Sequence, residues 1–82
     1  MCTGIVETVQ VAGSGKGPLG WFKLEQANVS HDHPTVAPFE DAVLIDFVNE
    51  KEGVGARVAV ELNPDSARKL ADAILVALSR EH

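Results

Sequence analysis

The stretch ARVAVELNPDSARKLADAILVALSR, residues 56–80, changes from a strand pattern to a helix pattern within a few residues. Apolar residues alternate with others from Ala56 to Leu62, which is typical of a strand with one covered face. Asn63 and Pro64 then predict a helix start, because asparagine caps helices and proline fits the first helical position. The apolar residues that follow recur at the spacing of one helical face, namely Ala67, Leu70, Ala71, Ile74, Leu75 and Leu78. We call these six residues the apolar stripe and predict that it packs on a sheet.

Three more strands are predicted upstream. Residues 4–11 (GIVETVQV) and 21–30 (WFKLEQANVS) alternate as strands do, and residues 41–49 (DAVLIDFVN) are nearly continuous in apolar side chains, as in a central strand. The glycine-rich residues 13–20 (GSGKGPLG) predict a flexible connection, since a P-loop needs its lysine followed by serine or threonine at a helix start. The predicted fold is α+β: one domain, residues 1–82, in which a four-stranded antiparallel sheet (β-β-β-β-α) carries one C-terminal helix on one face.

Composition excludes several classes of protein. A hydrophobic fraction of 45% with a charged fraction of 23% is that of a chain that folds, not of a disordered tail. The net charge of −5, without a run of lysine or arginine, argues against a nucleic-acid partner. No apolar run reaches the roughly 20 residues that span a membrane. With a single cysteine the fold has no internal disulfide, and we expect a cytoplasmic protein.

The sheet also predicts an oligomer. One helix covers only one face of four strands, so if Val43 and Ile45 face the helix, Leu44 and Val48 point the other way without a cover. A symmetric homodimer that packs sheet against sheet supplies that cover. The alternative is a partly solvated face with scattered apolar residues, as in many small proteins.

Residues 29–41 (VSHDHPTVAPFED) raise the question of a metal site. His31, Asp32 and His33 lie close together, and two histidines two apart on an extended chain point to the same side. A metal centre needs further ligands, for which the candidates are Cys2, Glu40, Asp41 and Asp46. The alternative is a polar connection between the second and third strands over residues 30–39, which contain two prolines.

Asp46 interrupts an apolar strand and needs a partner. If the following turn is centred on Lys51 and Glu52, Asp46 lies opposite Arg57, and the two form a cross-strand ion pair. A partly buried carboxylate beside an arginine can equally orient a ligand. The candidate ligand-binding residues are therefore Asp46, Arg57 and the aromatic Trp21.

The opening MCTG resembles the start of the bile salt hydrolases and penicillin V acylases, whose N-terminal cysteine is nucleophile and whose α-amine is base. That resemblance implies the nucleophile role for Cys2. Those enzymes are several times longer, and their αββα core has two sheets. A semi-buried structural thiol is the alternative for Cys2.

Taken whole, the chain resembles a family of short bacterial proteins, common in actinobacteria, that is classed as a domain of unknown function. The resemblance is carried by MCT, GSGKGPLGWFKL, DHP followed by AP, IDF, and ARVAVELNPDSARKLADAI. It implies no activity, but it directs attention to Cys2, Asp32, His33 and Asp46, whereas His31 lies outside the pattern.

Two hypotheses follow from the sequence. The first is a homo-oligomeric binding or interaction module, with a dimer favoured. The second is a metal-binding protein or small metalloenzyme that uses His33 with His31, Asp32 or Cys2. The sequence predicts no particular cofactor, substrate or reaction.

Overall fold

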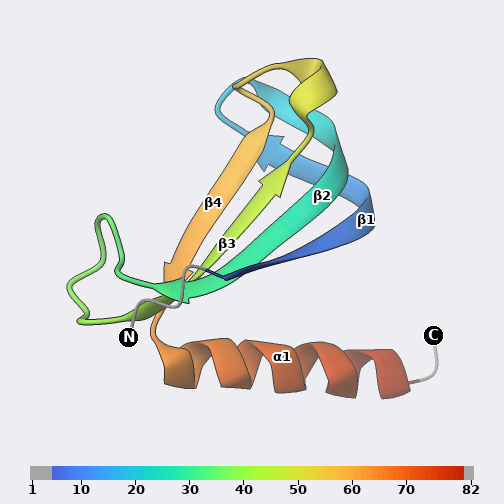
Figure 1. Cartoon of the computed structure of the whole chain (residues 1–82). Coiled ribbons are helices and arrows are strands. Elements are labelled where there is room, and N and C mark those ends of the chain that lie inside the picture. The colour runs from blue at the N-terminus through green and yellow to red at the C-terminus, as the bar shows by residue number, and fades with distance from the viewer. Residues whose placement is uncertain (1–4, 81–82) are drawn as a thin grey trace.

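The structure, a computed structural model, describes residues 5–80 of the chain. The elements are β1 (Val6–Gly17), β2 (Gly20–Asp32), β3 (Ala42–Val48), a 3-10 turn η1 (Glu50–Glu52), β4 (Arg57–Leu62) and α1 (Pro64–Ser79) (Figure 1). The strands form one antiparallel sheet in the order β1-β2-β3-β4, so each strand pairs with the next in the chain. The predicted α+β fold with four antiparallel strands and one C-terminal helix is confirmed. Within residues 5–80, no helix combines the length and the hydropathy that a membrane span requires.

The β1–β2 hairpin differs from its prediction. The glycine-rich segment is not a flexible connection, because β1 continues to Gly17, and only Pro18 and Leu19 separate it from β2. The register shifts by one residue between Gln10 and Gly13, so the irregularity lies in β1. The end of β1 also approaches the start of β4: a Cβ on Gly17 would lie 3.0 Å from the carbonyl oxygen of Arg57. Glycine is required there for close backbone approach rather than for flexibility.

The β3–β4 hairpin turns one residue later than predicted. The Asn49 side chain accepts a hydrogen bond from the Lys51 backbone N–H and caps the 3-10 turn, and Gly53 follows with a φ of +97°. The prediction that Asp46 lies opposite Arg57 is therefore wrong. Asp46 pairs with Ala59 and Arg57 pairs with Val48, so the two charged residues are diagonal neighbours.

The connection between β2 and β3 is present as predicted, but it is shifted. β2 continues through His31 to Asp32, so the connection covers residues 33–41 instead of 30–39. Two paired strands with alternating side chains then give the sheet two distinct faces. One face, here called the open face, carries Val43, Ile45, Phe47, Val58, Val60 and Leu62. The other, the loop face, carries Leu44, Asp46, Val48, Arg57, Ala59 and Glu61.

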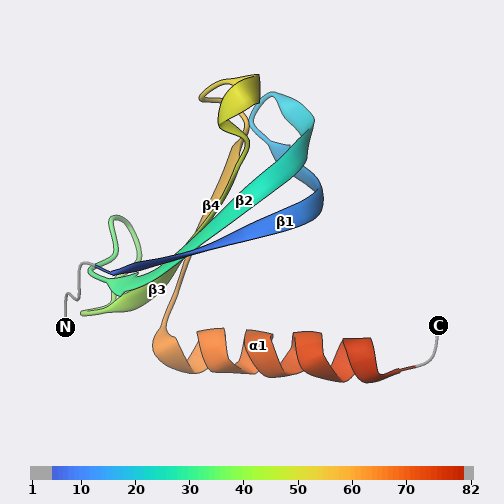
Figure 2. The ribbon, with the colours of Figure 1, turned by 45° about the vertical axis from the view of Figure 1, so that its right-hand side comes forward.

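The helix begins as predicted, but it does not pack as predicted. The Asn63 side chain accepts a 2.8 Å hydrogen bond from the Ser66 backbone N–H, and Pro64 occupies the first turn. From the lower end of β4, α1 runs away from the sheet (Figures 1 and 2). Pro64 and Ala67 are half-buried, whereas every residue from 68 to 80 is exposed. Asn63 alone joins β4 to α1, so the chain has no loop with which to lay the helix back over its own sheet.

The core of the single chain is correspondingly small. Among the described residues only Ala27, Ala42, Asn49 and Ala56 are buried. None of the large apolar side chains on the open face is among them. The Asn49 side chain, which donates to the carbonyl of Lys23 at 2.9 Å, ties the β3–β4 turn to β2.

Candidate functional site

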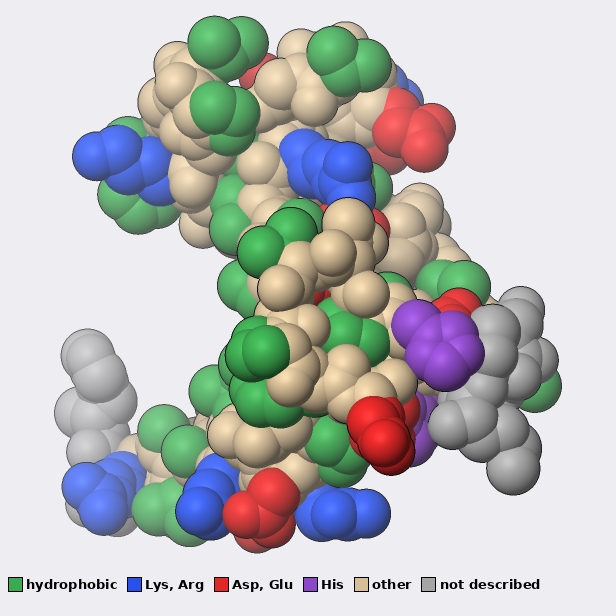
Figure 3. Space-filling model, turned by 90° about the vertical axis from the view of Figure 1, so that its left-hand side faces the viewer, with side chains coloured by type: hydrophobic (Ala, Val, Ile, Leu, Met, Phe, Trp, Pro, Cys, Tyr) green, Lys and Arg blue, Asp and Glu red, His purple; other side chains and the backbone are tan. Residues whose placement is uncertain are grey.

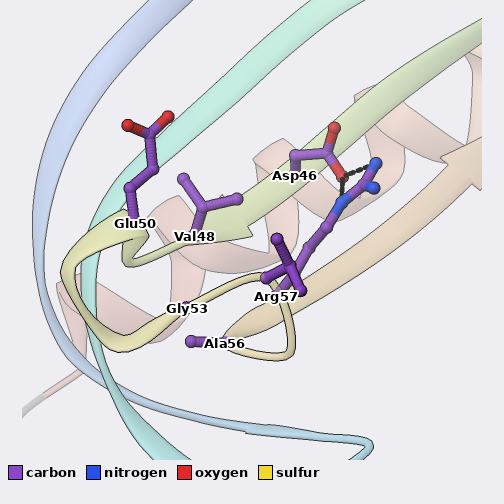
Figure 4. Close-up of a pocket in the computed structure, with 7 residues that line it drawn as sticks. Asp46, Val48, Glu50, Gly53, Ala56 and Arg57 are labelled. Atoms are coloured by element: carbon purple, nitrogen blue, oxygen red, sulfur yellow. Dashed lines mark hydrogen bonds and ion pairs between the residues drawn. The ribbon is translucent and has the colours of Figure 1, made fainter.

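Asp46 and Arg57 form the ion pair that the sequence predicts, although their register differs. The Asp46 Oδ1 atom accepts a hydrogen bond from Arg57 Nε at 3.0 Å and forms an ion pair with Nη2 at 2.9 Å (Figure 4). The pair lies beside a hollow of about 300 Å³ that is also lined by Val48, Glu50, Gly53, Val54 and Ala56. The hollow is therefore formed by the β3–β4 hairpin alone.

The ion pair between Asp46 and Arg57 limits what this hollow can bind, because each charged group of the pair already has a partner. Arg57 already binds Asp46 through one hydrogen bond and an ion pair, and both side chains are partly exposed, so the pair links β3 to β4 at the surface. Trp21, the third candidate ligand-binding residue, lies elsewhere. It lines a second hollow of about 340 Å³, the Trp21 hollow, whose other apolar residues are Leu24, Phe47 and Val58. The structure thus brings two of the three candidates together, and ligand binding by any of them stays a prediction.

The histidines hold the ends of the β2–β3 connection. His31 Nε2 forms a 2.5 Å hydrogen bond with the Asp41 carboxylate, which joins the end of β2 to the start of β3. The His31 hydrogen bond lowers the pKa of the Asp41 carboxyl. His33 Nδ1 lies 3.1 Å from the carbonyl oxygen of Glu40, and the His33 backbone N–H donates to Asp32. These contacts give both histidines a role in closing the loop.

The donors proposed for a metal do not converge in the part of the chain that the structure describes. Among residues 5–80 no three histidine, cysteine or carboxylate side chains are placed to share an ion. Cys2, both as a metal ligand and as the nucleophile suggested by MCTG, lies outside the described residues. The metal site therefore stays a prediction.

Sequence reasoning missed the contact that positions this loop. Glu61 on β4 accepts hydrogen bonds from three successive backbone N–H groups, those of Thr35, Val36 and Ala37, at 2.6, 3.0 and 2.8 Å. We call this arrangement the Glu61 clamp. Its donors, that of Ala37 most strongly, lower the pKa of the Glu61 carboxyl. The clamp holds the loop over the loop face and leaves the open face without such a cover.

Only the isolated carboxylate in the alternating ARVAVEL strand signals the clamp in the sequence. Its partners are backbone groups some 25 residues earlier, and no residue type marks them.

The family of unknown function DUF6295 matches residues 1–82. The chain belongs to this family. The resemblance to an uncharacterised family is thereby confirmed over the full length of this DUF6295 chain. No curated protein and no solved structure matches it.

Proposed function

We propose that this DUF6295 protein is a homodimeric interaction module, in which a second copy of the chain completes the hydrophobic core. One observation carries the proposal, the accessible surface. The chain exposes 6349 Å², whereas a compact monomer of 8.7 kDa exposes about 4,700 Å². The excess of about 1,600 Å² per chain amounts to about 3,200 Å² for two chains, within the range of obligate homodimers.

The dimensions of the chain support the same proposal. The radius of gyration is 13.7 Å, compared with about 11.7 Å for a compact domain of this length. The surplus surface is apolar in large part: Trp21, Ile74, Leu75 and Leu78 are all more than half exposed. A soluble monomer rarely presents so much apolar surface, and burying it in an interface stabilises the fold.

Dimerisation also accounts for how so short a chain is stable. With 82 residues, the chain lies just above the range of about 70 to 80 residues below which a single core rarely supplies enough stabilisation, so its margin is small and a second subunit would widen it. With one cysteine, this chain has no internal disulfide. We place the dimer in the cytoplasm as part of the proposal, since a fold held by packing alone suits a reducing compartment.

Thermal unfolding at two protein concentrations tests the proposal. If the folded state is a dimer, mass action raises the unfolding midpoint with concentration. We expect a clear rise in the midpoint between about 1 and 100 µM chain. A midpoint that is independent of concentration would mean that each chain folds alone, and the proposal would fail.

A further inference from the structure

We propose that helix α1 of each copy packs on the open face of the other copy's sheet, so that the dimer forms by reciprocal exchange of the two helices. The inference rests on the proposed homodimer and names the surfaces that make it. A single chain leaves two apolar surfaces without a full cover, namely the apolar stripe of α1 and the open face of the sheet.

The helix supplies the first surface. In the apolar stripe, Leu70, Ile74, Leu75 and Leu78 are 44%, 52%, 64% and 77% exposed. The charged residues of the helix, such as Lys69 with its i,i+4 partner Asp65, account for its solvated side. A helix with this much apolar surface gains its stability from what covers it, because isolated helices of this length are marginal in water.

The open face supplies the second surface. Its six residues are all apolar; Val60 is exposed, and the other five are only half-buried although they lie on the central and edge strands of the sheet. The loop of residues 33–41 is held on the other side of the sheet by the Glu61 clamp, so it does not cover them. At its upper end the open face continues through Phe47 and Val58 into the Trp21 hollow. Trp21 itself is 71% exposed, and tryptophan is the residue type most typical of an interface hot spot.

The two surfaces match in size. A helix of 16 residues is about 24 Å long, and a strand of seven residues such as β3 is about 23 Å long. A helix about 10 Å wide covers two strands that are about 4.8 Å apart. One helix therefore covers the part of the open face that β3 and β4 form.

The connection between β4 and α1 favours exchange over closure within one chain. Asn63 alone separates Leu62 from Pro64, and its backbone is extended at φ −66° and ψ 158°. A short, stiff hinge of this kind directs a terminal element toward a neighbouring chain. The space-filling view shows the result, a hollow between the helix at the lower end and the top of the sheet, with hydrophobic side chains along its wall (Figure 3).

Exchange is also the arrangement that leaves neither surface exposed. A dimer that packs sheet on sheet covers the two open faces and leaves both apolar stripes in water. A dimer that packs helix on helix covers the two apolar stripes and leaves both open faces in water. In the exchanged dimer, each helix packs on the sheet of the other copy, and a two-fold axis relates the two contacts. This arrangement covers both apolar stripes and both open faces with one kind of contact.

Two lysine substitutions and two controls test the arrangement. Leu75→Lys places a charge in the apolar stripe, and Val76→Lys adds the same charge on the opposite side of the helix, where Val76 is 51% exposed. Val60→Lys places a charge on the open face, and Ala59→Lys adds it one residue away on the loop face. At a concentration at which the wild type is dimeric by light scattering, we expect Leu75→Lys and Val60→Lys to be monomeric and both controls to be dimeric.

Mixing the two defective variants gives the sharper result. In a mixed dimer, the helix of the Val60→Lys chain meets the sheet of the Leu75→Lys chain, and both of those surfaces are unaltered. One of the two contacts is thus restored. We expect the equimolar mixture to form dimers at a concentration at which each variant alone is monomeric.

The other outcomes separate this inference from the proposed function. If Leu75→Lys stays dimeric, the sheets meet each other; if Val60→Lys stays dimeric, the helices meet each other. Either result overturns the exchange and leaves the homodimer standing. A monomeric wild type overturns both, and two monomeric variants that do not complement each other overturn the exchange.

Cross-linking covers the case in which Val60→Lys does not fold, as far-UV circular dichroism would reveal. In a Cys2→Ser background, a tagged Leu75→Cys chain is mixed with an untagged Val60→Cys chain and treated with a short bismaleimide. Exchange predicts a tagged-to-untagged product, and its absence contradicts exchange. The matched Val76→Cys chain, with its thiol on the opposite side of the helix, should give much less of that product.

Discussion

The Glu61 carboxylate on β4 accepts a 2.8 Å hydrogen bond from the backbone N–H of Ala37, although 24 residues separate the two in the chain. Thr35 and Val36 donate to the same carboxylate. Glu61→Gln removes the charge and turns one acceptor into a donor that opposes the backbone N–H groups. We expect amide hydrogen-exchange protection to fall at residues 35–37, with Glu50→Gln as a control that leaves it unchanged. Unaltered protection in Glu61→Gln would mean that the clamp does not hold the loop.

The same clamp predicts a pH dependence. Because backbone donors lower the pKa of Glu61 in the folded protein, the clamp is complete above the ordinary carboxyl value of 4.5 and weakens as the pH falls through the lower folded value. Protection factors at residues 35–37, corrected for intrinsic exchange, should therefore drop at acid pH before those of the sheet. Protection that falls everywhere at the same pH would contradict a local role for Glu61.

Gly17 is predicted to be intolerant of a side chain, unlike Gly13 earlier in the same strand. A Cβ on Gly17 would lie 3.0 and 3.1 Å from the carbonyl oxygens of Arg57 and Gly55, which are backbone atoms that cannot move independently of β4. We expect Gly17→Ala to lower the free energy of unfolding by about 1 to 3 kcal/mol. Gly13→Ala, whose Cβ meets the Leu24 side chain at an ordinary 3.8 Å, should cost clearly less in the same denaturant titration. Equal losses would mean that β1 does not approach β4.

The Asp46–Arg57 pair should contribute little to stability. Their side chains are 32% and 56% exposed, and solvent screens such a pair. In a double-mutant cycle with Asp46→Asn and Arg57→Gln, we expect a coupling free energy below about 1 kcal/mol. A coupling of several kcal/mol would show that the pair is shielded from water by something absent from the single chain.

The features that could be predicted from the sequence depend on near neighbours in the chain. Alternating residues indicate strands, and Asn63 followed by Pro64 marks the start of α1 through a local capping bond. The sequence could predict that Asp46 and Arg57 form an ion pair. It could not predict which residues face each other across the two strands, because that register depends on how Asn49 and Gly53 shape the turn.

The wrong predictions concern contacts between distant segments. The glycines before β2 indicate flexibility when considered alone, whereas Gly17 is glycine because the backbone of β4 passes close by. The apolar stripe indicates that α1 is covered, but it carries no information about which chain covers it. The Glu61 clamp uses backbone donors, which have no residue signature.

Sedimentation equilibrium of the untagged chain at micromolar concentration distinguishes a homodimer from a monomer, because it measures mass independently of shape. The proposed homodimer has a mass of about twice 8.7 kDa, since a second copy removes the surface that one chain leaves exposed. A single species of 8.7 kDa across that concentration range would contradict it.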